Sequence, residues 1–347
     1  MWLLNRVMLS IWSVTTLCAC VETAQAPVSH AEAAQFFSSP EVKEVWVEHG
    51  EDRFFCRMIG QGPPLVVLHG GPGLSQNYLL PHLYQLAQSH TVLFYDQRGS
   101  GASSAKISAE TMRIPVFVDD LEAIRASFGW GKISILGHSW GGFLALHYAL
   151  EHPESVDRLV LANSFCASSD GVRLYLQEWY RRMAPFQEEF AQIQQDPRLL
   201  AGDPEIAERS VHLILRTYCH DPAHVEHLDL RFSPQAALQA QQSAELLRQQ
   251  LLLEYSLYDS LKALSIPTLI IHGDADSVPL STAEELHQSL PQSRFVLLEN
   301  CGHFPYVEAP EAFFDAVRIF LATEAPALKS TGATSKVQSA ANSAALT

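Results

Sequence analysis

Short apolar runs alternate along this chain with longer stretches in which apolar residues recur at helical spacing. Strands are expected at residues 42–47, 54–59, 64–69, 91–95, 133–136 and 158–162, and helices at 78–89, 116–128 and 140–151. The runs at 64–69 and 91–95 are almost continuously apolar, which is typical of strands buried on both faces of a parallel sheet. This alternation predicts an α/β fold with helices on both faces of a mostly parallel sheet.

The alternation is interrupted between residues 166 and 262. This stretch is rich in Gln, Glu, Arg and Leu and is expected to be helical throughout. Strand patterns then return at 266–271 and 295–298, and a last helix is expected at 310–321. A helical block between two sets of strands predicts an insertion into one domain, so we call residues 166–262 the cap. Residues 40–165 and 263–322 then form the core.

The start of the chain has the pattern of a secretory signal. Arg6 precedes a mostly apolar run at 7–17, which is too short to span a bilayer. One possible cleavage site is the small-residue sequence Ala24-Gln25-Ala26, but a proline follows it directly. The other is Leu17-Cys18-Ala19-Cys20, which resembles a bacterial lipobox. We favour the second, in which residues 1–19 are removed and Cys20 is the lipidated first residue.

The segments outside the core have tether-like compositions. Residues 20–39 are rich in Ala, Gln, Ser and Pro, and are expected to form a flexible tether. Residues 323–347 are rich in Ala, Ser and Thr with few large apolar residues, and are expected to be disordered. Together with Cys20, these features predict an exported protein, either periplasmic or anchored to a membrane as a lipoprotein.

Charge and cysteine content narrow the classes of function. Acidic residues outnumber basic ones 38 to 23, which gives a formal net charge of −15. Such a chain is not expected to bind nucleic acid, because phosphate recognition requires a basic face. Six cysteines in 347 residues are too few for a disulfide scaffold. Cys56, Cys166, Cys219 and Cys301 would nevertheless allow up to two disulfides in an oxidising compartment.

The sequence Gly137-His-Ser139-Trp140-Gly141 carries the first candidate chemistry. It follows the strand expected at 133–136 and opens the helix expected at 140–151. A G-x-S-x-G sequence in this context forms a sharp turn that presents the serine hydroxyl above the sheet. The pattern therefore predicts that Ser139 is a catalytic nucleophile.

A serine nucleophile needs a base, and the base needs an acid that orients it. His303 lies just past the last expected strand and is the best placed of fifteen histidines. Asp274 and Asp276 both follow the strand at 266–271. We favour Asp276 as the acid, because its Gly-x-x-Asp turn places the carboxylate further out, toward the histidine loop.

Acyl transfer also needs N–H groups that stabilise a developing oxyanion. One is expected from Trp140, the residue after the nucleophile, and the second from Gly71 in His69-Gly-Gly-Pro-Gly73. Asp96 and Arg98 follow the next strand and are expected to form an internal ion pair that braces this region. The histidines of the cap show no metal-ligand spacing, and no metal is expected.

Three segments together identify a family resemblance. They are residues 69–73, 96–103 and 137–142, and Gly302-His303 with Glu308-Ala-Pro310 extends the match. The chain resembles the prolyl aminopeptidase (proline iminopeptidase, peptidase family S33) branch of the α/β-hydrolase superfamily. The resemblance implies an eight-stranded sheet with an inserted helical cap, a Ser–His–Asp triad and no cofactor. It also implies release of an N-terminal residue, often proline, from short peptides.

The resemblance is weaker in the cap, where an aminopeptidase holds the free α-ammonium with carboxylates. Some relatives carry Glu directly after the triad Asp, but here that residue is Ser277. Glu245 lies where some relatives keep an amine-binding Glu, and Glu254 is a second candidate. We assign both to substrate binding, together with Gly70 of the glycine-rich loop.

Three functions remain open from the sequence. The leading hypothesis is an aminopeptidase that forms an acyl-enzyme from a short peptide. The alternative is an esterase, lactonase or amidase for small uncharged acyl substrates, which would use the same triad. A non-catalytic binding protein on this scaffold is the third, and the intact Ser139, Asp276 and His303 set argues against it.

Overall fold

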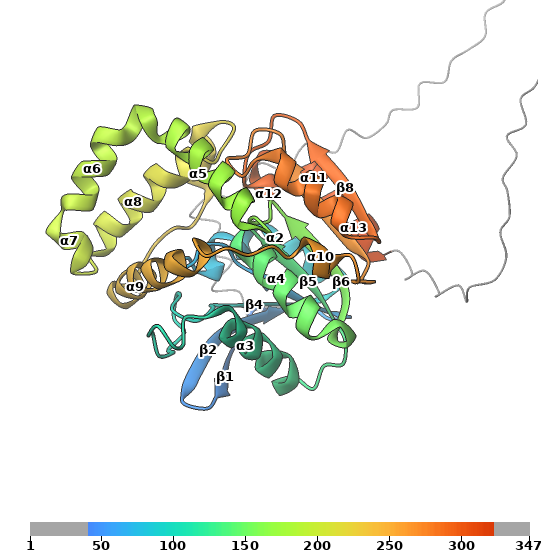
Figure 1. Ribbon diagram of the computed structural model, residues 1–347. Coiled ribbons are helices and arrows are strands. Elements are labelled where there is room, and N and C mark those ends of the chain that lie inside the picture. Colours follow the sequence, from blue (N-terminus) through green and yellow to red (C-terminus); the bar gives the residue numbers. More distant parts are fainter. Residues whose placement is uncertain (1–40, 323–347) are drawn as a thin grey trace, which may run out of the picture.

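The computed structural model describes residues 41–322 (Figure 1). The predicted signal at 1–19, Cys20, the tether at 20–39 and the tail at 323–347 lie outside the described residues. Between residues 41 and 322, no helix is both long enough and apolar enough to cross a membrane. Export and lipidation therefore stay predictions.

An eight-stranded sheet forms the centre of the protein, with the strand order β1-β2-β4-β3-β5-β6-β7-β8. The strands are β1 (Lys43–His49), β2 (Asp52–Ile59), β3 (Pro64–Leu68), β4 (Thr91–Tyr95), β5 (Ile133–His138), β6 (Val156–Ala162), β7 (Thr268–Gly273) and β8 (Ser293–Leu298). Only the β1–β2 and β2–β4 pairings are antiparallel; the other pairings are parallel. The predicted α/β fold class is confirmed.

Alternate residues of the central strands enter two different cores, one on each face of the sheet. In β3, Val66 and Leu68 belong to one core, and Leu65 and Val67 belong to the other. The first core is completed by α3 (Ile114–Ser127), α4 (Trp140–Glu151) and α11 (Leu280–Ser289), and the second by α2 (Leu80–Leu83), α12 (Pro305–Glu308) and α13 (Pro310–Ala322). Successive residues of a strand point to opposite faces of the sheet, and both faces are buried here. The central strands therefore need nearly continuous apolar runs.

The helix expected at 78–89 is broken into short pieces, which corrects the sequence prediction. A 3₁₀ turn at Gln76–Tyr78 precedes α2, and a second 3₁₀ segment, Tyr84–Gln88, follows it. Pro81 lacks a backbone N–H and is tolerated only in the first turn of a helix, so α2 has to begin beside it. The break leaves Tyr78 buried in the first turn, pointing into the protein.

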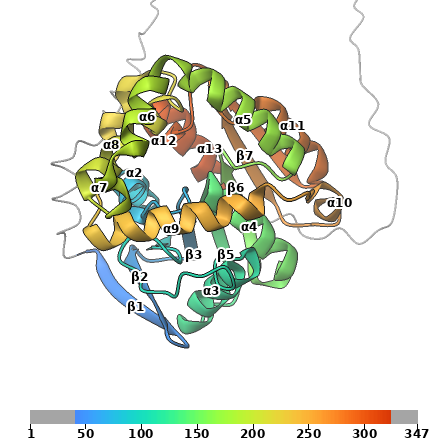
Figure 2. The ribbon, with the colours of Figure 1, turned by 60° about the vertical axis from the view of Figure 1, so that its left-hand side comes forward.

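The inserted segment is helical, and its three longest helices begin at side chains that cap them. The helices of the segment are α5 (Ser169–Met183), α6 (Gln187–Gln195), α7 (Pro197–Leu200), α8 (Pro204–Arg216), α9 (Pro234–Leu251) and α10 (Tyr258–Leu261). Ser168 caps α5, Asp203 caps α8 and Ser233 caps α9, each accepting a first-turn N–H as such residues commonly do. In Figure 2, α9 crosses in front of the sheet, with α5 to α8 above it and α3 below.

Helix α9 packs directly on two loops that follow core strands. Ser243 Oγ donates to the Gly99 carbonyl at 3.1 Å, and Gln239 Nε2 donates to the Ser103 carbonyl at 3.3 Å. Gly73 lies so close to the same helix that a Cβ there would sit 2.7 Å from Ala240 Cα. The cap is therefore anchored on the loops that follow β3 and β4.

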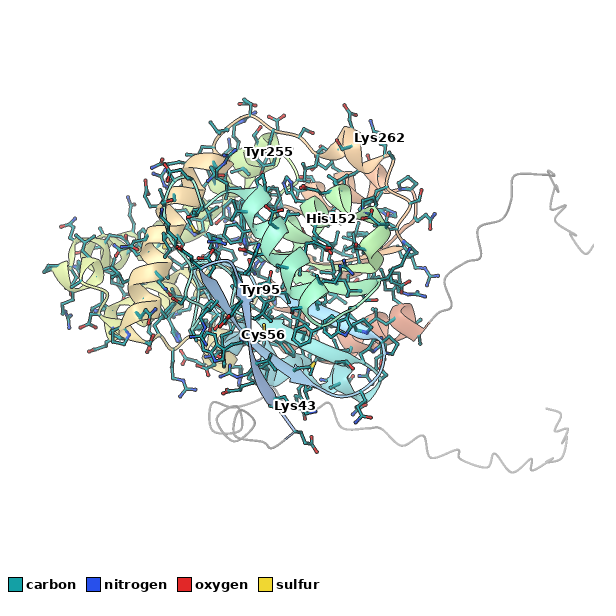
Figure 3. The ribbon with its side chains drawn as sticks, turned by 90° about the horizontal axis from the view of Figure 1, so that it is seen from below. Lys43, Cys56, Tyr95, His152, Tyr255 and Lys262 are labelled. Atoms are coloured by element: carbon teal, nitrogen blue, oxygen red, sulfur yellow. The ribbon has the colours of Figure 1, made fainter. Side chains whose placement is uncertain are left out.

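The four cysteines of the described region are free and buried, so the disulfides that the sequence allowed are absent among them. Burial raises the pKa of Cys56 and of Cys166 to about 12. Cys56 faces Tyr95 in the β2–β4 pairing, and both are labelled in the interior in Figure 3. Thiols of this kind behave as small apolar side chains rather than as nucleophiles.

Several buried histidines make the fold sensitive to acid. Burial lowers the pKa of His82 and of His147 to about 4, and that of His138 to about 3. The unfolded chain takes up these protons near pH 6.5, so between about pH 6.5 and 4 it binds more protons than the folded protein. Stability is therefore expected to fall as the pH falls through this window.

His82 offers a direct test, because its Nε2 atom meets only the His227 carbonyl, at 3.1 Å. His82→Gln keeps a donor there but cannot titrate. We expect urea unfolding to show a smaller loss of stability between pH 6.5 and 4.5 for this variant, by up to about 1.4 kcal/mol per pH unit. Identical pH dependence of the two proteins would contradict the assignment.

Candidate active site

The predicted nucleophile lies on a strained turn between β5 and α4. Ser139 has φ 55° and ψ −121°, a conformation rarely adopted by residues other than glycine. The neighbouring backbone approaches closely, because a Cβ on Gly141 would lie 2.2 Å from the Leu68 carbonyl oxygen. The turn thus has the form that the G-x-S-x-G pattern predicts, at the carboxyl end of a central strand.

A buried carboxylate–imidazole pair lies at the same edge of the sheet. His303 Nδ1 is 2.9 Å from both carboxylate oxygens of Asp276, and both side chains are almost fully buried. Asn163 Nδ2 donates to Asp276 Oδ2 at 2.7 Å, and the Val278 N–H donates to Oδ1 at 3.0 Å. Because the carboxylate only accepts, His303 Nδ1 carries the proton, and Nε2 is left to receive one.

The surroundings of Asp276 keep it ionised. Burial alone would raise the pKa of Asp276, but the neighbouring His303 and the hydrogen bonds from His303 and Asn163 outweigh burial and hold it below its usual range. The pair can therefore stabilise an imidazolium, as a general base requires.

The histidine loop lies directly against the nucleophile turn. His138, the residue before Ser139, has its Nε2 atom 2.8 Å from the His303 carbonyl oxygen, and the two rings have centroids 4.8 Å apart. Asp274, the alternative acid, instead accepts the Cys301 N–H at 3.2 Å. The structure thus brings together Asp276, His303 and the Ser139 turn, and places Asp274 in the loop behind them.

The glycine-rich loop after β3 runs beside the serine. A Cβ on Gly70 would lie 3.0 Å from Ser139 Cβ, and Gly71 has φ +125°, which favours glycine. Trp140 is the first residue of α4, so its N–H belongs to the first turn, where no intrahelical acceptor exists. Both N–H groups expected to bind an oxyanion therefore belong to backbone next to Ser139.

Gln97 holds the two oxyanion segments together. Its side-chain Nε2 donates to the His69 carbonyl at 2.7 Å, and its Oε1 accepts from Trp140 Nε1 at 2.9 Å. Its own N–H donates to His69 Nε2 at 3.0 Å. One side chain thus joins the loop after β3 to the start of α4.

One detail of the sequence prediction is wrong here. Asp96 and Arg98 do not form an ion pair with each other: Asp96 accepts the N–H groups of Gln76 and Ala102, at 2.9 and 2.8 Å. Arg98 pairs with acidic residues elsewhere, at 2.7 Å from both Asp52 and Asp120. Gly70, assigned to substrate binding, donates its N–H to Tyr78 Oη at 2.6 Å, and its contact with a substrate stays a prediction.

The two glutamates assigned to amine binding lie away from the triad contacts. Glu245 is exposed on α9 and pairs with Arg248 at 3.0 Å. Glu254 is exposed after α9 and pairs with Arg173 at 2.9 Å. The structure brings neither carboxylate into contact with Ser139 or with the histidine, so it offers no support for their assigned role.

Sequence reasoning missed the polar residues that brace the carboxylate–imidazole pair. Asn163 directly follows β6 at the same edge of the sheet, which is a usable signal in the sequence. Tyr218 comes from the cap, where its carbonyl accepts the His303 N–H at 3.0 Å and its ring lies 5.0 Å from the histidine ring. Its hydroxyl also contacts that of Tyr175. Nothing in the local sequence marks the last two residues.

Glu308 is a fourth residue of this kind. Its buried carboxylate accepts the N–H groups of Gly302 and Phe304, each at 3.0 Å, on either side of the triad histidine. It also accepts the N–H of His220, from the cap, at 2.7 Å.

Among the described residues, no group of three or more His, Cys, Asp or Glu side chains is arranged to hold a metal ion.

Comparisons with known proteins agree with this geometry. The family model described as alpha/beta hydrolase fold matches residues 63–310. A proline iminopeptidase of Lactobacillus delbrueckii subsp. lactis is 30% identical over 281 residues, covering 77% of this chain and 94% of the relative. One from Lactobacillus helveticus is 29% identical over 272 residues, covering 75% of this chain and 90% of the relative.

Solved structures share the fold. The crystal structure of VinJ is 25% identical with a TM-score of 0.60, covering 81% of this chain and 99% of that one. The proline iminopeptidase of Mycobacterium smegmatis is 24% identical with a TM-score of 0.58, covering 80% and 97%. With the strained serine turn and the buried carboxylate–imidazole pair, these matches show that the chain belongs to the α/β-hydrolase fold family and is a serine hydrolase of the prolyl aminopeptidase-like type.

Proposed function

We propose that this protein is an aminopeptidase that releases N-terminal residues, of the proline type, from short peptides through an acyl-enzyme. Ser139 is the nucleophile, His303 the general base and Asp276 the residue that orients it. The observation that carries the proposal is the 2.9 Å contact of His303 with Asp276 beside the strained Ser139 turn. The names of the relatives, proline iminopeptidases, favour peptides as substrates.

The proposed reaction has two halves. Ser139 Oγ attacks the carbonyl carbon of the first residue while its proton passes to His303 Nε2. The C–N bond then breaks, and the leaving amine takes the proton from His303. A water molecule attacks the acyl-enzyme in the same way, giving its proton to His303, which returns it to Ser139 as the ester bond breaks.

Two backbone donors are assigned to stabilise the negative charge that develops on the substrate's carbonyl oxygen. They are the N–H groups of Trp140 and Gly71. Their support is the approach of the glycine-rich loop to Ser139 and the free first turn of α4. Losing one such donor typically costs about 2.7–4 kcal/mol of transition-state stabilisation. Gln97, which joins both segments, would keep the donors at a fixed separation.

A second candidate is an esterase, lactonase or amidase for small uncharged acyl groups. The observation that favours it is the engagement of Glu245 and Glu254 with arginines at exposed positions. The cap side chain that contacts His303 is instead Tyr218, whose ring lies 5.0 Å from that of the histidine and whose hydroxyl contacts that of Tyr175. Aromatic side chains such as these can pack against an uncharged acyl group as well as against a proline ring.

The cellular location belongs to the proposal as well. We infer export through the signal at residues 1–19 and attachment to a membrane through lipidated Cys20. The support is the sequence alone, namely the short apolar run and the lipobox-like Leu17-Cys18-Ala19-Cys20.

Substitution of the two neighbouring aspartates separates the roles assigned to them. Asp276→Asn removes the charge that favours the imidazolium, so kcat is expected to fall by about four orders of magnitude. Asp274→Asn is the matched control: it alters a carboxylate that accepts the Cys301 N–H, and we expect kcat to stay within about tenfold of wild type. Steady-state kinetics on folded protein would measure both. Wild-type activity of Asp276→Asn would refute the assigned acid.

Substrate charge separates the two candidate functions. Prolyl and alanyl chromogenic amides would be compared with the same amides carrying an N-acetyl group, and with a short-chain ester. An aminopeptidase should hydrolyse the free amines at least about 100-fold faster in kcat/KM, because its binding site is built for a desolvated ammonium. Equal rates on free and acetylated amides would favour the esterase or amidase reading.

A further inference from the structure

A chain of hydrogen bonds runs through the interior between the glycine-rich loop and the histidine loop. The Gly70 N–H donates to Tyr78 Oη at 2.6 Å, and Tyr78 Oη lies 2.8 Å from His138 Nδ1. His138 Nε2 then lies 2.8 Å from the His303 carbonyl oxygen. The side chains of Tyr78 and His138 are each 1% exposed, so bulk water does not compete for these bonds.

The direction of every bond in this chain is fixed by chemistry. The His303 carbonyl only accepts, so His138 Nε2 carries a hydrogen and donates it. Burial, followed by the nearby His303, lowers the pKa of His138 to about 3, so the ring is neutral and Nδ1 is a bare acceptor. Tyr78 therefore donates its hydroxyl hydrogen to Nδ1 and uses its oxygen to accept from Gly70. Each polar atom of the chain therefore has a partner of the right kind, and the Tyr78 oxygen has two.

Aromatic contacts lock the chain in place. The ring of His138 lies 5.7 Å from that of Tyr78, 5.5 Å from that of Phe304 and 4.8 Å from that of His303, between ring centroids. Tyr78 and Phe304 meet edge to face at 6.3 Å. The two polar side chains are therefore held by packing as well as by hydrogen bonds, and have little freedom to rotate.

We propose that Tyr78 and His138 are positioning residues, which fix the oxyanion loop and the His303 loop relative to each other across the nucleophile turn. This inference rests on the proposed function, because it assigns Gly71 and His303 to the same reaction. The chain begins at Gly70, next to the oxyanion donor, and ends on the backbone of the general base. A shift of either loop would break a buried hydrogen bond.

The side chains of Tyr78 and His138 satisfy two buried backbone groups, the Gly70 N–H and the His303 carbonyl, which an apolar pair would leave unpaired. A positioning role follows from which two loops these bonds join. Connected buried hydrogen bonds specify a single arrangement of the groups that they join. The bonds of this chain join the two loops that must be aligned for acyl transfer, and a misplacement of about 1 Å in such groups lowers rates by about 100-fold.

Tyr78→Phe tests the inference, with Tyr148→Phe as the matched control. Tyr148 is also buried, on the helix that follows the nucleophile, but its hydroxyl donates to Glu122 at 2.7 Å, outside the site. Both variants lose one tyrosine hydroxyl and should lose similar stability in urea unfolding. We expect kcat to fall by about 10- to 100-fold in Tyr78→Phe, with KM changed by less than about threefold. Tyr148→Phe should keep both constants.

A second pair of variants keeps the inference testable if Tyr78→Phe does not fold. His138→Gln can still donate to the His303 carbonyl, whereas His138→Leu cannot, so the Gln variant should retain about tenfold more kcat. Adding Tyr78→Phe to His138→Leu should lower kcat little further, because the chain is already broken. Equal kcat of the Gln and Leu variants, or wild-type kcat of Tyr78→Phe, would overturn the positioning role.

The proposed function is tested separately in the same protein. Wild-type hydrolysis that is lost in Asp276→Asn, with labelling of Ser139 by a fluorophosphonate probe, establishes it before the variants are compared. A folded wild-type protein that neither hydrolyses amides or esters nor reacts with the probe would overturn the proposed function, and this inference with it. Nitrogen NMR of His138 at pH 7 adds a readout independent of activity. It should show the neutral ring with its hydrogen on Nε2, and a hydrogen on Nδ1 would overturn the assigned direction of the chain.

Discussion

The buried negative charge of Asp276 is the constraint on which the carboxyl edge of the sheet depends. An ionised carboxylate cannot be removed from water unless other groups replace its hydration. Here His303, Asn163 and the Val278 N–H supply donors at 2.7–3.0 Å. These donors follow β8, β6 and β7. The need to solvate one charge therefore holds the ends of three strands together, and the same donors orient the imidazole toward Ser139.

The cap takes part in this arrangement rather than merely covering it. Arg182 of α5 donates to the carbonyls of Ala275 and Asp276, at 2.7 and 2.8 Å. The Tyr218 carbonyl accepts the His303 N–H, and the Glu308 carboxylate joins the histidine loop to the cap through His220. The cap is thus hydrogen-bonded to the loops that carry Asp276 and His303. Substrate specificity and catalytic geometry would share the same residues, which explains why the cap is difficult to interpret from its sequence.

The sequence predicts what is local, and misses what depends on distant contacts. The serine turn and the histidine loop follow from short motifs at strand ends, and the period-2 apolar runs predict the strands to within a few residues. Arg98 was assigned to the wrong acid because its partners, Asp52 and Asp120, are distant in the chain. The prediction of one helix at 78–89 did not take account of the missing backbone N–H of Pro81. The break at this proline places Tyr78 in the interior.

The ion pairs of the cap change what the negative charge of the protein implies about substrate binding. The net charge of −15 is compatible with a cationic substrate as a long-range field. Around His303, however, the cap presents tyrosines and an arginine: the Tyr218 ring lies 5.0 Å from that of His303, the Tyr175 hydroxyl contacts that of Tyr218, and Arg182 pairs with Glu178 at 2.6 Å. A long-range field raises the local concentration of a substrate amine, but holding the amine in place needs a desolvated, unpaired carboxylate. Glu245 and Glu254 are both paired with arginines, so neither supplies such a carboxylate in this arrangement, and the preference between free and acetylated amides decides whether another group does.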